Sequence, residues 1–213
     1  MTADIAKILG HTPVVPLVQA DDPQTAVRIS RALASGGLAV AEIVFRTDAA
    51  LECLAAVAAE VPEMIAGAGT VLSAQQAEQA IDAGARFVVS PGLDADTVRL
   101  CQSNSIPIYP GVMTPTEATK AWNLGLRDVK FFPAMLAGGI PMLKALGSVF
   151  RAMRFMPTGG VSASNLADFL VVPGVLACGG SWLTPAEAIA AGNYDAITRL
   201  AAEAVAIATK ARA

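Results

Sequence analysis

Short apolar runs alternate with amphipathic stretches along the whole 213-residue chain. The eight apolar runs begin at Pro13, about Val40, Met64, Arg86, Ile106, Asp128, Arg154 and Val175. They are apolar nearly throughout, which is typical of strands covered on both faces, as in parallel sheets. Strands that alternate with helices in this way predict parallel strands joined by helical crossovers.

The stretches between these runs carry the start and stop signals of helices. Residues suited to cap a helix N-terminus precede several of them, namely Asp22, Asp48, Ser73, Thr114 and Ser162. Glycines close three of them, at Gly36, Gly84 and Gly125. We therefore expect a helix to follow each strand.

Eight strand–helix units can close into a barrel. The predicted fold class is therefore α/β, a single (β/α)8 TIM barrel domain over residues 1–213. A doubly wound open sheet is the alternative, but no G-x-G-x-x-G sequence follows the first strand. In a barrel, site residues are expected at the C-terminal ends of the strands.

The composition limits the possible partners. Charged residues make up 15% of the chain, against roughly 25% in an average soluble domain, so we predict that a homo-oligomer buries part of the surface. A net charge of −3 without a basic run argues against binding to nucleic acid or to an anionic membrane. The first ten residues lack the apolar core of a signal peptide. We expect a cytoplasmic protein that acts on a small molecule.

Histidine and cysteine usage argues against a metal site. His11 is the only histidine, which excludes histidine-rich zinc sites and removes the usual general base. Cys53, Cys101 and Cys178 are far apart in apolar surroundings and are interpreted as buried free thiols. We expect neither a metal nor another cofactor.

Lys130 lies inside an apolar strand, between Val129 and Phe131. Side chains alternate along a strand, so Lys130 and Phe132 share one face and Val129 and Phe131 share the other. The apolar pair suits the surrounding helices, which directs Lys130 into the barrel. Burial there disfavours the ammonium, and only the neutral amine attacks a carbonyl to form a Schiff base. The alternatives are a lysine that reaches solvent from the strand end and a buried salt bridge.

The second strand carries two charges on one face. Ile43 and Phe45 can pack on helices, which directs Glu42 and Arg46 inward, with Arg46 nearer the rim. Even-numbered strands contribute to one interior layer, so Glu42 is expected to meet Lys130 on the sixth strand. This grouping predicts a nucleophilic amine, a carboxylate base and a guanidinium for a substrate carboxylate. A purely structural ion-pair cluster is the alternative.

Glycine-rich segments follow the last two strands, Thr158-Gly159-Gly160 and Gly179-Gly180-Ser181. Many barrels bind phosphate between these two loops through backbone N–H groups. Plain tight turns are the alternative.

Gly67–Thr70 and Ser90–Gly92 end the third and fourth strands and are expected to shape the mouth of the barrel. The Thr70 hydroxyl can donate to a bound carboxylate, whereas Pro91 can also serve only to stop its strand. Phe132, on the same face as Lys130, is a further predicted substrate contact.

Seven segments resemble, in this order, the bacterial 2-keto-3-deoxy-6-phosphogluconate (KDPG) aldolase family, whose members are also called 4-hydroxy-2-oxoglutarate aldolases: EIVFRT, GAGTVL, SPGL, YPGVMTPTE, VKFFPA, PTGGVS and GGSWL. The resemblance covers nearly the whole chain. It implies a metal-independent class I aldolase that forms homotrimers and acts in the cytoplasmic Entner–Doudoroff route.

The resemblance also implies roles for single residues. Lys130 matches the Schiff-base lysine and Glu42 the acid–base glutamate. Arg46, Thr70 and Pro91 match positions at the pyruvate end. The phosphate-binding loops are matched by Gly159, Gly160, Gly180 and Ser181. Ile43 and Phe45 depart from the Val and Leu of typical members, but they are expected to face outward.

A relative that cleaves the galactonate epimer lacks the arginine of EIVFRT and the threonine of PTGG. Arg46 and Thr158 therefore imply the gluconate-derived substrate, cleaved to pyruvate and D-glyceraldehyde 3-phosphate. An aldolase for the galactonate epimer or for 4-hydroxy-2-oxoglutarate is an alternative. An isomerase or another lyase on a phosphate-binding barrel, and a non-catalytic sugar-phosphate binder, are two further ones.

Overall fold

The structure is a computed structural model that describes residues 5–213. Its strands are β1 Val14–Val18, β2 Val40–Val44, β3 Ile65–Gly69, β4 Val88–Val89, β5 Ile108–Tyr109, β6 Gly111–Val112, β7 Asp128–Phe131, β8 Arg154–Pro157 and β9 Cys178–Gly180. Its helices are α1 Ile5–His11, α2 Pro23–Ser35, α3 Ala50–Glu60, α4 Ala74–Asp82, α5 Ala95–Ser103, α6 Pro115–Asn123, α7 Gly139–Val149, α8 Leu166–Leu170, α9 Ala186–Ala190 and α10 Tyr194–Arg212.

The strands form a closed parallel barrel. One sheet has the order β5-β4-β3-β2-β1-β9 and the other the order β6-β7-β8. β5 and β6 are the two halves of one barrel strand, separated by Pro110, which has no N–H to donate. Bridges from Phe155 to Val175 and from Thr158 to Gly179 join β8 to β9 and close the ring. The predicted (β/α)8 barrel is confirmed, and Lys130, on its sixth strand, lies on β7.

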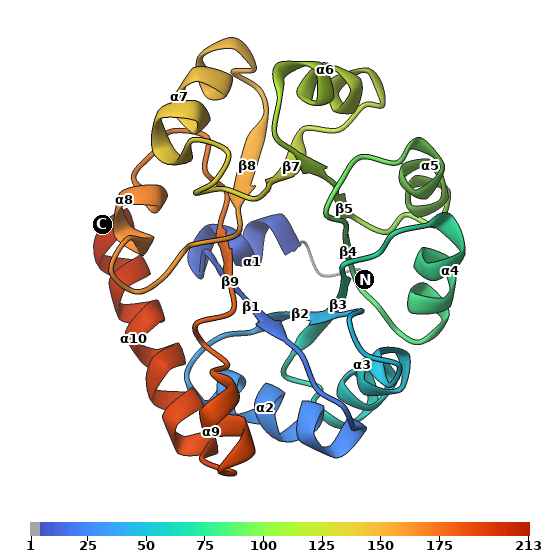
Figure 1. The fold of residues 1–213 in the computed structure, drawn as a ribbon, viewed down its shortest axis with the longest axis vertical. Coiled ribbons are helices and arrows are strands. Elements are labelled where there is room, and N and C mark those ends of the chain that lie inside the picture. The colour runs from blue at the N-terminus through green and yellow to red at the C-terminus, as the bar shows by residue number, and fades with distance from the viewer. Residues whose placement is uncertain (1–4) are drawn as a thin grey trace.

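A ring of helices surrounds the strands (Figure 1). The main core lies between strands and helices, where Ile43, Val129 and Phe131 are buried. These residues point outward from β2 and β7, as predicted. Phe45 is partly buried against the same core, so the outward placement of Ile43 and Phe45 is confirmed.

Three of the five predicted caps are confirmed. The side chains of Asp22, Ser73 and Thr114 accept hydrogen bonds from backbone N–H groups at the starts of α2, α4 and α6. The prediction for Asp48 was wrong, because the chain first turns at Thr47–Ala50 and α3 has Ala49 at its N-cap without a side-chain bond.

The prediction for Ser162 was also wrong. Its N–H donates to Asn165 Oδ1 at 2.8 Å, and the Asn165 amide donates to Gly160 O at 2.9 Å. The loop after β8 is therefore extended by a turn, and α8 begins only at Leu166. The three predicted helix ends are confirmed, since Gly36 follows α2 directly, and Gly84 and Gly125 follow α4 and α6 with positive φ.

Helix α1 precedes the barrel and was not indicated by the strand–helix pattern. Ile5 and Leu9 pack with interior side chains near the N-terminal ends of the strands, including Val15 and Val40. This end of the barrel is therefore plugged by apolar residues. The prediction that the first ten residues are no signal peptide involves residues 1–4, which lie outside the described residues. Within residues 5–213, no helix is both long and apolar enough to cross a bilayer.

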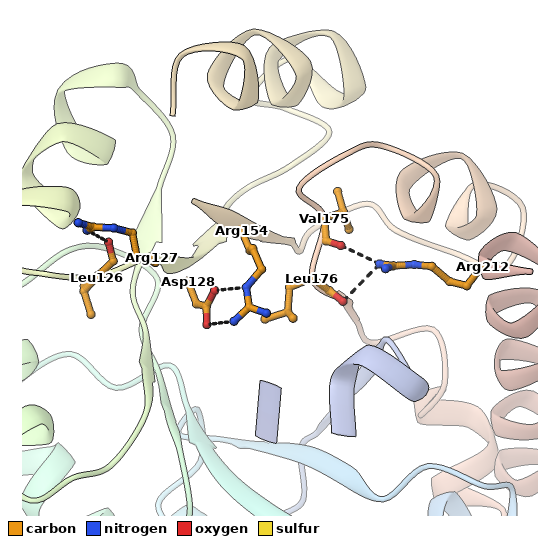
Figure 2. Close-up of polar contacts among 7 residues, drawn as sticks. All are labelled: Leu126, Arg127, Asp128, Arg154, Val175, Leu176 and Arg212. Carbon is orange, nitrogen blue, oxygen red and sulfur yellow. Dashed lines mark hydrogen bonds and ion pairs between the residues drawn. The ribbon is translucent and has the colours of Figure 1, made fainter. Parts of the chain in front are cut away.

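Hydrogen bonds and an ion pair are made by residues at or just before the starts of β7, β8 and β9 (Figure 2). Arg154 donates twice to the Asp128 carboxylate, at 2.6 Å for each bond. Arg212, at the end of α10, donates to Val175 O at 2.7 Å and Leu176 O at 3.4 Å. These contacts lie at the N-terminal ends of the strands. The C-terminal ends of the strands, at the opposite end of the barrel, are where a site is expected.

Candidate active site

The barrel interior brings one lysine and one glutamate together. Lys130 Nζ on β7 lies 3.5 Å from Glu42 Oε1 on β2, and their side chains are 3% and 0% exposed. The Phe132 ring centroid lies 5.1 Å from the same nitrogen. The prediction that Lys130 points inward and meets Glu42 is confirmed. The structure therefore places an amine beside a carboxylate at a buried position inside the barrel.

The second carboxylate oxygen of Glu42 has no partner. Oε2 is buried and makes no hydrogen bond with any described residue. A buried acceptor without a donor costs about 1–3 kcal/mol, and such exceptions call for an explanation. A purely structural ion pair would use both oxygens at short range. The long bond and the idle oxygen instead suit a group that accepts a proton from a bound molecule.

An apolar layer lies below the pair. Phe87 and Tyr109 pack edge to face with their ring centroids 6.1 Å apart, in one cluster with Val89 and Met156. Val40, two residues before Glu42 and on the same strand face, belongs to this cluster. The layer excludes water from below, so a ligand must enter from the C-terminal ends of the strands.

Arg46 lines a cleft at that end. The cleft has a volume of about 430 Å³ and lies between the ends of β1 and β2, the segment after β9, and α9. Ser181 and Thr184 contribute to the same wall. Among residues 5–213 the Arg46 guanidinium has no ion-pair or side-chain hydrogen-bond partner, and the residue is exposed. An unpaired cation at the mouth of a barrel is suited to bind an anionic group.

The two glycine-rich loops lie side by side. Thr158 pairs with Gly179 in a parallel bridge, and Thr158 is buried with its hydroxyl 3.3 Å from Met156 O. Gly159 and Gly160 both have positive φ, a conformation that favours glycine. The backbone N–H groups of Gly160 and Ser181 make no hydrogen bond to any described residue. Free N–H groups of this kind are suited to hold a phosphate.

Gly180 packs against the ring of Trp182. The Trp182 side chain lies where a Cβ of Gly180 would be. A side chain at position 180 would displace the indole and the loop that carries Ser181.

Three more predicted contacts lie at strand ends. Thr70 directly follows β3 with a φ of +60°, a strained conformation for a β-branched residue. The carbonyl of Pro91, after β4, lies against Gly111 of β6. Phe132 directly follows β7 and precedes a cis peptide bond to Pro133. The structure thus places all three at the open end of the barrel.

One expectation needs correction. Gly67 and Gly69 do not shape the mouth, because they lie within β3 and face the interior, next to Phe87 and Glu42 respectively. Only Thr70 of this segment lies beyond the strand. Val44 and Leu17, which line the cleft, were not singled out from the sequence. Their inward direction follows from strand alternation, but apolar residues give no signal of a site.

The three cysteines are free and buried, as predicted. Burial raises the pKa of Cys53 and of Cys101 to about 11, and it raises that of Cys178 as well. These thiols take no part in the site.

Comparisons with known proteins agree on one family. The family model described as KDPG and KHG aldolase matches residues 5–200. The KHG/KDPG aldolase of Escherichia coli K12 is 45% identical over 198 residues, 93% of each chain. The 2-dehydro-3-deoxy-phosphogluconate aldolase of Treponema pallidum is 44% identical over 203 residues, 95% of this chain and 97% of the relative.

A solved structure of KDPG aldolase from Legionella pneumophila superimposes with a TM-score of 0.90. It is 37% identical in sequence, and the match covers 95% of this chain and 98% of that one. It holds pyruvate captured at low pH as a covalent carbinolamine intermediate.

Proposed function

The chain belongs to the KDPG and KHG aldolase family, and we propose on this premise that it cleaves 2-dehydro-3-deoxy-6-phosphogluconate to pyruvate and D-glyceraldehyde 3-phosphate. It is a class I aldolase, which forms a Schiff base with its substrate. The observation that carries the proposal is the buried Lys130–Glu42 pair inside a barrel of this family.

The reaction starts at the C2 ketone of the substrate. The neutral amine of Lys130 adds to C2 and gives a carbinolamine, which loses water to form a protonated imine. Glu42 carries protons to and from the adding and leaving groups. Its free Oε2 and its contact with Lys130 support this role.

Glu42 then removes the proton of the C4 hydroxyl. The electrons of the C3–C4 bond move into the imine, C4 becomes the aldehyde of glyceraldehyde 3-phosphate, and an enamine remains on Lys130. Protonation of the enamine at C3 and hydrolysis of the imine release pyruvate and restore the free amine. All groups needed for these steps are contributed by this chain, so neither a metal nor another cofactor enters the proposal.

Substrate orientation follows from charge. Arg46 and Thr70 are proposed to hold the C1 carboxylate, with Pro91 and Phe132 against the pyruvate portion. At the other end, the backbone N–H groups of Gly159, Gly160 and Ser181 are proposed to hold the phosphate, with Gly180 shaping the loop. The exposed, unpaired Arg46 and the unused N–H groups of Gly160 and Ser181 support this orientation.

Thr158 is proposed to select the stereochemistry at C4. Its buried hydroxyl makes only a 3.3 Å bond to Met156 O and remains able to bond a substrate hydroxyl. Together with Arg46, it favours the gluconate-derived substrate over the galactonate epimer.

Cleavage of 4-hydroxy-2-oxoglutarate is a second candidate function. The relative from Escherichia coli K12 bears both activities in its name, KHG/KDPG aldolase. The imine chemistry at Lys130 is the same for both substrates, and only the phosphate loops would lie unused.

We further propose that residues 1–213 act as one barrel domain in a cytoplasmic homotrimer. Large apolar side chains on the surface support association between copies, above all Leu136, which is 90% exposed, together with Leu72 and Val149. The low charge content of the chain points in the same direction.

A coupled assay with a dehydrogenase that consumes pyruvate tests the function. We expect turnover of the gluconate-derived 6-phosphate well above that of the galactonate epimer. Borohydride with pyruvate should add one three-carbon unit to Lys130, located by peptide mass. Turnover without trapping at Lys130 would contradict the assignment of Lys130 as the Schiff-base lysine. Trapping without turnover would contradict the assignment of the gluconate-derived 6-phosphate as the substrate.

A further inference from the structure

We infer that Gly69 is a positioning residue for Glu42: its missing side chain leaves the space in which the catalytic carboxylate lies. The inference rests on the proposed function and deepens it, because it names what holds the proton-transfer group beside Lys130. Gly69 itself touches no substrate and carries no group that reacts.

Strand pairing brings the two residues together. β2 and β3 are parallel, with Glu42 opposite Gly67 and Val44 opposite Gly69. Glu42 and Gly69 both face the barrel interior, and the glutamate side chain runs forward along the strands over Gly69. A Cβ built on Gly69 would overlap Oε1, Cγ and Cδ of Glu42. The carboxylate therefore occupies the position that any other residue at 69 would fill.

The requirement for glycine at this position is one of space. Gly69 is a regular strand residue and is not among the residues with positive φ. Its backbone suits alanine, and its carbonyl accepts the Phe45 N–H at 2.7 Å, a bond that a side chain leaves intact. Alanine at position 69 is therefore compatible with the strand but not with the observed Glu42 side chain.

Gly67 provides a matched comparison on the same strand face. A Cβ on Gly67 would overlap the Phe87 ring, which belongs to the apolar layer below the site. The two glycines thus make room for different neighbours: Gly67 for a core ring, and Gly69 for the carboxylate. Substituting the first should disturb packing, and substituting the second should disturb chemistry.

The expected effect of Gly69→Ala on kcat follows from which atoms must move to admit the new methyl group. The three atoms nearest to a Cβ at position 69 are all in the Glu42 side chain, from Cγ outward, so the glutamate must take another rotamer. In Gly69→Ala the carboxylate would leave its place beside Lys130 Nζ, and proton transfer would lose its geometry. Because general acid–base catalysis contributes typically about 100- to 10,000-fold, we expect kcat to fall by about 100-fold or more.

The first experiment compares Gly69→Ala with Gly67→Ala in the coupled assay, with Tm and borohydride trapping measured on each. Gly69→Ala should still fold, with a cooperative thermal transition, and still be labelled at Lys130 with pyruvate, while kcat falls. Gly67→Ala should lower Tm by overpacking and keep most of its kcat. Equal losses of kcat in both variants, or an unchanged kcat in Gly69→Ala, would overturn the inference.

The second experiment is a double-mutant cycle with Glu42→Gln. If Gly69 acts through Glu42, Gly69→Ala should reduce kcat by less than about threefold in the Glu42→Gln background, because the group that it positions is already disabled. Losses that multiply would show a general distortion of the barrel and contradict the inference. A wild-type protein that neither cleaves the substrate nor traps pyruvate would instead contradict the proposed function itself, so the two failures are distinguishable.

Discussion

Lys130 Nζ and Glu42 Oε1 lie 3.5 Å apart inside the barrel, although 88 positions separate the two residues in the chain. Neither side chain is more than 3% exposed. The pair joins opposite parts of the barrel wall, and it leaves Glu42 Oε2 without a partner. A charge pair in this state is expensive to bury, and its retention fits a role in moving protons.

Replacing Glu42 by glutamine should slow cleavage while the fold persists. Glutamine keeps the shape of the side chain but cannot accept the C4 hydroxyl proton, so kcat should fall by about 100- to 10,000-fold. Circular dichroism should be unchanged. Glu63→Gln, at an exposed carboxylate before β3, is the matched control and should behave as wild type. Near-normal turnover in Glu42→Gln would remove its assigned role.

Replacing Arg46 by alanine should weaken substrate binding more than it slows chemistry. The guanidinium has no protein partner in residues 5–213, so its loss should leave Tm unchanged and raise KM by about tenfold, the effect of roughly 1.4 kcal/mol of lost binding. Arg154→Ala should do the reverse, since Arg154 is bonded twice to Asp128 at the far end of the barrel. A drop in Tm for Arg46→Ala with unchanged KM would contradict the assignment.

The cap of α5 should make stability depend on pH. The Thr97 side-chain hydroxyl and then the Thr97 backbone N–H donate to Asp94 and hold the pKa of its carboxyl below the ordinary 3.8. The stabilisation is therefore fully present above that value and is lost as pH falls through the lower pKa of the folded state. Asp94→Ala should cost about 1 kcal/mol at pH 7, and the difference from wild type should shrink in urea titrations near pH 3.

Asp48→Ala is the control for this cap. Asp48 precedes α3 but caps no helix, so its removal should change the free energy of unfolding very little at either pH. A loss as large as that of Asp94→Ala would mean that the cap assignment at α3 is incorrect.

The thiols should resist alkylation while the protein is folded. Burial raises the pKa of Cys53 and Cys101 to about 11, so little thiolate exists at pH 8, and burial also blocks access. Iodoacetamide should modify none of the three cysteines in buffer and all three in urea, as counted by intact mass. Rapid modification of one thiol in buffer would show local opening of the helix or strand that carries it.

The free N–H groups of the two glycine loops lead to a prediction for small anions. Inorganic phosphate should compete with the phosphorylated substrate, and Ser181→Ala should weaken this competition less than Ser181→Pro, because the backbone donor matters more than the hydroxyl. Competition lost equally in both variants would place the hydroxyl, and not the N–H, at the phosphate.

Local patterning determined which segments became strands and which way their side chains point. Alternation on β7 and β2 already directs Lys130 and Glu42 inward and Val129, Phe131 and Ile43 outward, because apolar side chains must meet the surrounding helices. The resemblance to a known family added the roles of the loop residues. Two of the five predicted caps failed, because Asp48 and Ser162 have suitable side chains but lie in turns that precede α3 and α8.

Only the tertiary structure decided what depends on several strands at once. The plug formed by α1 and the different spaces beside Gly67 and Gly69 have no local signature. A glycine in a strand indicates that a neighbouring group occupies the space of its missing side chain. Which group lies there depends on the register and tilt of the strands in the barrel. The 3.5 Å contact between Lys130 and Glu42 has the same origin, because a closed barrel sets the distance between residues that sequence spacing leaves unspecified.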